Sequence, residues 1–440
     1  MTADIDLGND QTKIGSESTP YQGTFDGQGH SLTVAYVDTY GSSQHVAPFI
    51  KIKNATIQNL HVKGSITTVG MRPAGITSYV TGTCYVRNCW SEVDITSSYN
   101  ADICAGGIVT RIDSEQTLNM SDCLFTGSIT LSNSNGYRAG GLIGWTQNNG
   151  TANVQNCLFA PSGVTSTKSS TDNKMLVSGY QSNVSITNCY YKHVGSTSNW
   201  VAQGTEATAG VSDGTTTAAL QNNRAEDVWV QDPLTNQPML KLFANRISYT
   251  MPTSGLGTFS AKARCALPEG LEAYYCKNYN SSTGRISVVA IEGAVPAETG
   301  VLLRGTAGAT YTLTGTNATV GTVADNALVA VTTQTSIPQT IGGYTNFGLN
   351  GGEFIMVNEN GGTVKANRAY LQILTTALQS STRGIALDWD NETTAIGKEA
   401  IVMGAESTSG QWYTIGGRKL AGQPTQKGIY IVNGKKVVIK

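Results

Sequence analysis

A four-residue phrase that ends in cysteine recurs through the first half of this 440-residue chain. Counting from the equivalent Leu60, the cysteines follow at intervals of 29, 34, 34 and 32 residues. A regular period of this length is typical of stacked repeats, in which each unit forms one turn of a solenoid. The phrases are VRNC (86–89), MSDC (120–123), VQNC (154–157) and ITNC (186–189), preceded by IQNL (57–60).

Each repeat contains three short apolar stretches separated by Gly, Asn and Ser. One follows the cysteine, as in CLFTGSI (123–129), one is a glycine phrase such as AGGLIGW (139–145), and one leads to the next cysteine, through CYV, LNM, ANV and VSI. Apolar and polar residues alternate with period two, as in strands that bury one side. We therefore expect residues 1–194 to form a right-handed parallel β-helix.

In a solenoid of this kind, equivalent residues of successive coils stack about 4.8 Å apart. We expect the cysteines to form an internal column of free thiols, because side chains with the same orientation make disulfide geometry awkward. The preceding residues should form the corner, where a short amide tolerates left-handed backbone and can bond its neighbour. The two columns are Cys89, Cys123, Cys157 and Cys189, and Asn59, Asn88, Asp122, Asn156 and Asn188.

Two glycine pairs, Gly106/Gly107 and Gly140/Gly141, allow two interpretations. A glycine-rich loop can hold a phosphate, but that site needs the N-terminus of a following helix. Here each pair precedes a strand. We favour a structural role in which glycine permits a sharp bend or a close approach between coils.

Several phrases resemble bacterial surface proteins that carry GLUG motifs. YQGTFDGQGHSLT (21–33) and APFIKIKNATIQNLHVKGSI (47–66) resemble the opening of such proteins, and AGGIVTR (105–111) and AGGLIGW resemble the repeat itself. The resemblance implies an extracellular β-solenoid of adhesin type. In that family the repeats also occur beside the protease domain of immunoglobulin-cleaving enzymes, but no HExxH signature occurs here. The phrases depart from the repeat in two coils, at Pro73 and in MLVSGY (175–180).

The rest of the chain resembles secreted proteins of Bacteroides and Prevotella. Residues 247–278 and 286–313 are similar to a module of these proteins, and 412–440 is similar to Bacteroidetes sorting tails. The resemblance implies a secreted, outer-membrane or cell-surface location. The N-terminus MTADIDLGND lacks the layout of a secretory leader, so we expect either a cytoplasmic chain or one whose leader has been removed.

The expected domains beyond the solenoid follow from composition and turn signals. Residues 195–246 read as a cap or linker in which Trp229 and Leu240 cover the open end of the solenoid. Residues 247–398 show short strands typical of an antiparallel β-sandwich, and 399–440 should form a hairpin around Asn433-Gly434. Cys265 and Cys276 are either bridged or free. The predicted fold class is all-β.

Composition excludes several functions. The formal net charge is −1, with Lys and Arg dispersed, so no nucleic-acid partner is expected. No apolar run approaches the roughly 18 residues of a membrane helix. The four histidines lack metal-ligand spacing, so we expect no metal and no cofactor. No GxSxG phrase marks a nucleophile.

Outward-facing side chains leave two functional hypotheses. Glu92 and Asp94 could serve as paired carboxylates of a polysaccharide lyase or glycosidase, although Lys63 in the preceding coil suggests an ion pair instead. Aromatic and apolar residues could form a strip that binds sugars or proteins, unless another segment packs over them. The strip residues are Trp90, Leu124 and Leu158, with Tyr137, Trp145 and Tyr180 near corners.

We therefore expect a non-enzymatic adhesin-like protein that presents its solenoid to glycans or to proteins of a host or neighbouring cell. The alternative is a carbohydrate-active enzyme on the same scaffold. The oligomeric state stays open.

Overall fold

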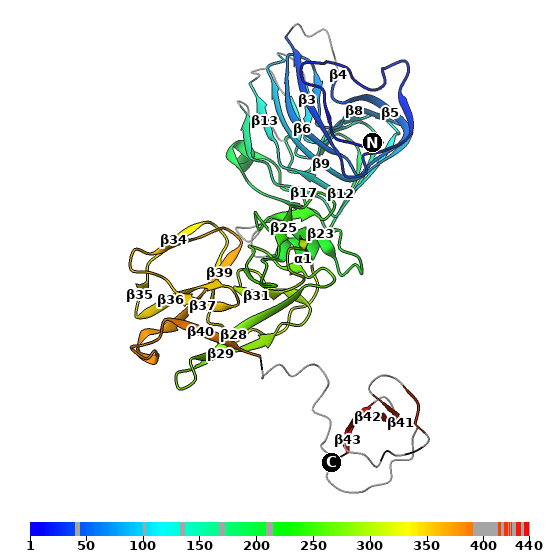
Figure 1. The fold of residues 1–440 in the computed structure, drawn as a ribbon. Coiled ribbons are helices and arrows are strands. Elements are labelled where there is room, and N and C mark those ends of the chain that lie inside the picture. The colour runs from blue at the N-terminus through cyan, green and yellow to red at the C-terminus, as the bar shows by residue number, and fades with distance from the viewer. Residues whose placement is uncertain are drawn as a thin grey trace.

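The computed structural model is nearly all β, with a solenoid of about 5 turns followed by antiparallel sheets (Figure 1). This confirms the predicted fold class. The structure describes residues 1–39, 45–99, 103–132, 137–166, 172–207 and 214–389, together with 412–414, 418–420, 422, 424, 428–432 and 435–439.

The solenoid has three faces, each a parallel sheet. They are numbered in the order in which the chain passes through them after each corner residue. The first face holds β3 (Ser31–Asp38), β6 (His61–Thr68), the second half of β9 (Thr83–Ser97), β13 (Ser128–Leu131), β17 (Leu158–Phe159), β18 (Gly163–Ser166) and β21 (Tyr190–Tyr191). The second face holds the start of β5 (Phe49–Gln58), β8 (Thr77–Thr81), β11 (Val109–Ile112), β15 (Ile143–Thr146) and β19 (Val177–Gly179). The third face holds β2 (Tyr21–Asp26), the ends of β5, the start of β9, β12 (Thr117–Phe125), β16 (Thr151–Gln155) and β20 (Asn183–Thr187).

Shorter strands complete the coils. β1 (Ile5–Asp6) pairs with β3, β4 (His45–Val46) with β7 (Arg72–Pro73), and β10 (Ile103–Gly106) with β14 (Tyr137–Gly140), all in parallel. The register places Cys89 opposite Cys123 and Trp90 opposite Leu124, so equivalent residues of neighbouring coils stack. Alternate residues of β9 are buried and exposed along the strand, as the period-two pattern predicts.

The solenoid ladder extends beyond residue 194. After η1 (Gly195–Asn199), β22 (Thr205–Glu206) pairs in parallel with β21. Inside the coils Phe125 stacks on Phe159 at 5.7 Å between ring centroids, and Phe159 stacks on Trp200 at 6.3 Å. Trp200 is buried and ends this internal stack. It thus occupies the place that sequence analysis gave to Trp229 and Leu240.

The cap segment, residues 214–244, packs against the side of the solenoid. It contains α1 (Thr215–Gln221) and the antiparallel pair β23 (Trp229–Gln231) and β24 (Pro238–Leu240). Figure 1 shows this segment between the solenoid and the antiparallel domain. The prediction that Trp229 and Leu240 cover the open end was therefore wrong in position, because these side chains bury the outer apolar surface of the coils.

The antiparallel domain has a smaller and a larger sheet. The smaller sheet is β25 (Arg246–Thr250), β32 (Thr310–Gly315), β27 (Cys265–Ala266) and β30 (Ala294–Val295). The larger sheet runs β26 (Leu256–Phe259), β31 (Val301–Arg304), β28 (Glu272–Asn280), β29 (Arg285–Ala290), β40 (Gly384–Asp388), β37 (Glu353–Met356), β36 (Tyr344–Asn350), β39 (Arg368–Leu374) and β33 (Leu328–Val331). In the same sheet β35 (Thr340–Ile341) pairs with β36, and the chain also forms the separate pair β34 (Thr335–Ile337) and β38 (Gly362–Val364), and η3 (Thr375–Ala377).

Strand β28 is buried on both sides and separates two hydrophobic cores. Ala273 and Tyr275 belong to one core, whereas Tyr274 and Cys276 belong to the other. Cys265 lies in the first core, and both cysteines are free. At the C-terminus, β41 (Trp412–Thr414), β42 (Gly428–Val432) and β43 (Lys435–Ile439) are antiparallel. The Asn433-Gly434 turn itself lies outside the described residues.

Candidate functional site

The corner column has left-handed backbone and bonds from coil to coil. All five residues have φ between 50° and 54°. Asn88 Nδ2 donates to Asn59 Oδ1 at 2.8 Å, and Asn188 Nδ2 donates to Asn156 Oδ1 at 2.8 Å. Asn and Asp adopt this conformation at lower cost than other residues with a side chain. The column therefore fixes where each coil turns.

The cysteine column lies inside the coils and has no reactive character. The backbone N–H of Cys123 points at the sulfur of Cys157 at 3.4 Å, and all the cysteines are free. Burial raises the pKa of the Cys123 and Cys157 thiols well above the ordinary value. Protonated, buried thiols pack as small apolar groups.

The glycine pairs serve close packing. Gly106 lies opposite Gly140 in a parallel ladder, and Gly107 N–H donates to Gly141 O at 3.1 Å. A Cβ on Gly107 would lie 2.6 Å from the Phe125 ring, and a Cβ on Gly141 would lie 2.6 Å from the Phe159 ring. Glycine is needed for space, and each pair leads into a strand, β11 or β15, and not into the helix that a phosphate site needs.

The apolar strip predicted as a binding surface is covered. Leu124 and Leu158 are buried beneath Leu220, Trp229 and Leu240 of the cap segment. Because Leu124 and Leu158 are at most 1% exposed, no ligand reaches these two side chains. Another segment of the chain thus packs over these side chains, which is the alternative that sequence analysis left open.

Trp90 lies at the rim of the cap segment and is half-buried. Its ring stacks on His61 with centroids 3.7 Å apart, and Phe243 of the cap lies 6.2 Å away. The indole N–H donates to Thr126 Oγ1 at 2.7 Å. Trp90 thus contacts side chains of the neighbouring coils and of the cap segment.

The other aromatic candidates lie apart from Trp90. Trp145 is 8% exposed on the second face, where the Arg138 guanidinium lies 4.3 Å from its ring centroid. Tyr180 follows β19 and is 57% exposed. Tyr137 begins β14, and its side chain lies outside the described set. The structure does not bring these residues together with Trp90.

Glu92 and Asp94 of β9 form an ion pair and hydrogen bonds with residues of the neighbouring coils. Glu92 lies opposite Lys63 in the register, and its carboxylate pairs with His61 Nε2 at 3.1 Å. Asp94 accepts hydrogen bonds from the N–H and the hydroxyl of Ser128, at 3.0 and 2.7 Å. These contacts favour a structural role over paired catalytic carboxylates.

A cluster of ionisable groups surrounds Tyr79 on the second face. Lys51, Arg72 and Arg111 place their charges 4.9, 5.6 and 5.7 Å from the ring centroid. The Tyr79 hydroxyl donates to Asp113 at 2.7 Å. Burial, followed by this hydrogen bond, raises the pKa of Tyr79 to about 12.

His45 lies edge-on to Tyr79 within the same cluster. Its Nε2 is 2.7 Å from Glu17 Oε1 and 3.1 Å from Arg72 Nη1. Burial and the Arg72 charge lower the pKa of His45 to about 4. Sequence analysis missed this cluster, although the register aligns Lys51, Tyr79 and Arg111 at equivalent positions of successive coils.

A groove on the third face of the solenoid is lined mostly by polar residues. It has a volume of about 350 Å³. Tyr85, Asn119, Asn153 and Ser185 lie opposite one another on successive strands, and Asn153 Nδ2 donates to Asn119 Oδ1 at 3.0 Å. Tyr85 is 44% exposed. The remaining lining residues are Arg87, Met120, Ser121, Val154, Gln155 and Thr187.

The groove residues were not singled out by sequence analysis, although a signal for them existed. They are the middle residues of CYV, LNM, ANV and VSI, the stretches that lead into each corner. In a strand whose flanking residues point inward, the middle residue points outward. Aligning those stretches by coil would have placed one tyrosine and three small polar residues in a single outward column.

The described residues contain no group of three or more His, Cys, Asp or Glu side chains placed to hold a metal ion. Within those same residues, no helix has the length and apolarity needed to cross a membrane.

Comparison with known proteins identifies no family for this chain. No protein-family model matches the chain, and no curated protein matches it. A crystal structure from Bacteroides ovatus, described as a "putative immunoglobulin A1 protease", is similar with a TM-score of 0.37 and 18% identity. The match covers 55% of this chain and 84% of that one. A likeness of this extent supports neither an activity nor a ligand.

Proposed function

We propose that this chain is a non-enzymatic, secreted or cell-surface protein of adhesin type that binds glycans through the groove on the third face. The observation that carries the proposal is the column in which exposed Tyr85 lies in line with Asn119, Asn153 and Ser185. The first half of the chain would provide the binding surface, and the antiparallel domain would provide a stalk or anchor.

The chemistry of the groove suits a sugar. An exposed aromatic ring offers an apolar face with a polar edge, which suits a ligand that has both kinds of surface. The Asn and Ser side chains supply donors and acceptors for sugar hydroxyls. Because parallel strands repeat about every 4.8 Å, an extended glycan meets similar groups in each coil.

The groove lining carries a single charge, and this low charge favours a neutral glycan and binding without chemistry. Its lining contains one ionisable group besides the tyrosine, Arg87, whose Nε donates to Gln58 Oε1 at 2.8 Å. The lining contains no carboxylate or histidine. General acid–base cleavage of a glycosidic bond requires such groups within reach of the substrate.

A carbohydrate-active enzyme, either a lyase or a glycosidase, is the second candidate. The convergence of His45, Arg72 and Tyr79 on the second face favours it, because catalytic sites gather ionisable groups. Two features weigh against it. His45 is 5% exposed, and Tyr79, with a pKa of about 12 and its proton donated to Asp113, is a poor base near neutral pH.

The test combines a glycan array with an assay for released reducing ends, using the full chain. We expect selective retention of neutral glycans without product. Tyr85→Ala should lower affinity by at least about fivefold, since loss of an aromatic contact costs about 1 kcal/mol or more. Tyr180→Ala, which removes an exposed tyrosine outside the groove, is the matched control. Release of reducing ends, or unchanged binding by Tyr85→Ala, would overturn the proposal.

A further inference from the structure

The antiparallel domain contains a pocket of about 540 Å³ that is remote in sequence from the solenoid groove. It lies where β26, at one end of the larger sheet, meets β36 and β39 near the other end. Figure 1 places β36 and β39 in the antiparallel domain, away from the solenoid coils. None of the sequence motifs or sites described above uses this pocket.

The pocket forms at a seam within the larger sheet. The bonds that join β26 to β39 run from side chains to backbone. Ala369 N–H donates to Thr258 Oγ1 at 3.1 Å, and the Ser260 hydroxyl donates to Arg368 O at 2.8 Å. Asn367 Nδ2 also donates to Ser260 O at 3.1 Å. These bonds hold the two strands together and keep the backbone on either side of the pocket fixed.

The pocket has a positive lining. Arg368 and Lys365 contribute to it, and the lining includes no Asp or Glu. The Arg368 guanidinium lies 4.4 Å from the ring centroid of Tyr249, which is 1% exposed and whose hydroxyl donates to Thr258 O at 3.1 Å. A buried ring held in this way fixes the guanidinium above it.

Arg368 has hydrogen-bonding capacity to spare. Its Nη1 donates to Asn367 O at 3.0 Å. In the part of the chain that the structure describes, no carboxylate pairs with this guanidinium. A guanidinium has five N–H donors arranged to bind a carboxylate through two parallel hydrogen bonds. The unneutralised charge is therefore available to an anionic ligand.

The remainder of the lining is rich in neutral polar groups. Thr253, Thr363 and Asn350 bear hydroxyl and amide groups, and the half-buried Tyr370 has its pKa raised by burial. A tyrosine whose pKa is above 10 keeps its proton near neutral pH and can donate or accept. These groups match the hydroxyls of a sugar ring better than an apolar side chain.

We propose that this pocket binds an acidic sugar residue, a uronic or sialic acid, with its carboxylate on Arg368 and its hydroxyls on the neutral lining. A charged, two-bonded Arg–carboxylate contact provides affinity and orientation. The antiparallel domain is then a second binding module with a preference opposite to that of the solenoid groove. This inference does not depend on the groove.

The test measures binding of D-glucuronate to the full chain by calorimetry or saturation-transfer NMR, with D-glucose and acetyl-Gly-Gly as comparison ligands. We expect glucuronate to bind, and we expect its affinity to fall as salt is added. Arg368→Gln should lower affinity at least about tenfold, and Arg368→Lys should restore part of it. Lys365→Gln, a change at an exposed position, should lower affinity by a smaller factor.

Two variants complete the design. Arg383→Gln removes an arginine that donates to Ser380 O and Thr382 O outside the pocket, and should leave binding unchanged. Tyr85→Ala should also leave glucuronate binding unchanged, which separates this site from the groove. The thermal unfolding of each variant shows whether it folds. The proposal would be overturned if glucose or acetyl-Gly-Gly bound as well as glucuronate. It would also be overturned if Arg368→Gln, or Lys365→Gln, left the affinity for glucuronate unchanged.

Discussion

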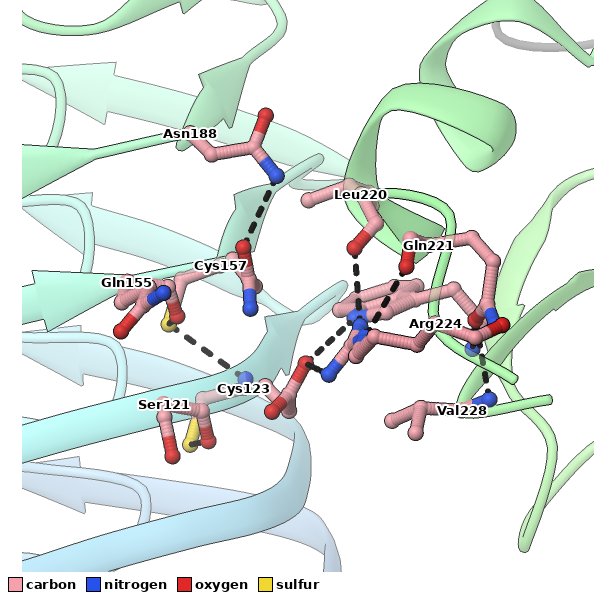
Figure 2. A network of polar contacts seen from close by, with 12 residues as sticks. Ser121, Cys123, Gln155, Cys157, Asn188, Leu220, Gln221, Arg224 and Val228 are labelled. Carbon is pink, nitrogen blue, oxygen red and sulfur yellow. Dashed lines mark hydrogen bonds and ion pairs between the residues drawn. The ribbon is translucent and has the colours of Figure 1, made fainter. Parts of the chain in front are cut away.

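The Arg224 guanidinium donates a 2.9 Å hydrogen bond to the Asp122 carboxylate, although the two residues are 102 positions apart. The indole N–H of Trp229 donates to the same carboxylate oxygen at 3.0 Å. Arg224 also donates to the carbonyls of Leu220 and Gln221 at the end of α1, as Figure 2 shows. Asp122 stands where the other corners carry asparagine. The acidic corner residue therefore attaches the cap segment to the solenoid.

Asp122→Asn should weaken this attachment while keeping the coil intact, because asparagine accepts the same left-handed backbone. The ion pair with Arg224 is lost, while the amide oxygen still accepts a hydrogen bond, and we expect unfolding to become easier by about 1 kcal/mol. Guanidinium chloride unfolding measures the change. Glu269→Gln, at an exposed turn, is the control and should shift the midpoint little. An unchanged midpoint in Asp122→Asn would show that the ion pair does not hold the cap.

The corner shows what sequence can and cannot reveal. Repeats of 29 to 34 residues made the column visible, since each asparagine has a partner at a similar separation. Nothing local in MSDC indicates that Asp122 binds residues of the cap, because that contact depends on how two folded units dock. For the same reason Leu124 and Leu158 were recognised as outward-facing, whereas their cover by another segment stayed one of two alternatives.

Trp200→Ala should destabilise the chain by about 3–5 kcal/mol, because it removes a buried aromatic side chain from the end of the internal stack. Trp200→Phe is the informative comparison. It keeps a ring against Phe159 and removes an indole N–H that is buried without a partner among the residues that the structure describes. We therefore expect a cost below about 1.5 kcal/mol. Equal losses for the two variants, measured by chemical unfolding, would argue against an end-closing stack.

All eight cysteines should stay unlabelled by iodoacetamide in the native protein and react only in denaturant. Each is buried and free, and burial raises the pKa of Cys276 to about 12, as it raises the pKa of Cys123. Because the thiolate is the reactive form, both factors slow alkylation. Mass spectrometry of native and denatured samples counts the labels. Fewer than eight labels in denaturant without reductant would reveal a disulfide.

The groove and the strip illustrate a further limit of sequence analysis. Large aromatic and apolar side chains such as Trp90 and Leu124 attracted the binding hypothesis, although such groups are also those that docking buries. The groove column instead combines Tyr85 with small neutral residues, which are common throughout this chain. Composition could not distinguish them, but their alignment on adjacent strands does.

Stability should fall in mild acid because of His45. Its pKa in the folded chain is about 4, below the ordinary value of 6.5, owing to burial and to the neighbouring charges of Arg72 and Lys51, which outweigh Glu17. Between these two values the unfolded chain binds a proton that the folded chain does not. The stabilisation is therefore complete above about pH 6.5 and declines as pH falls toward 4, by up to about 3 kcal/mol.

The unfolding midpoints of the wild type and of His45→Gln, compared from pH 4.5 to 7.5, measure this effect. The carboxylates titrate in both proteins, so the difference between the two midpoints isolates the contribution of His45. The two curves should converge as the pH falls, and parallel curves would mean that His45 is protonated in the folded chain as easily as in the unfolded one.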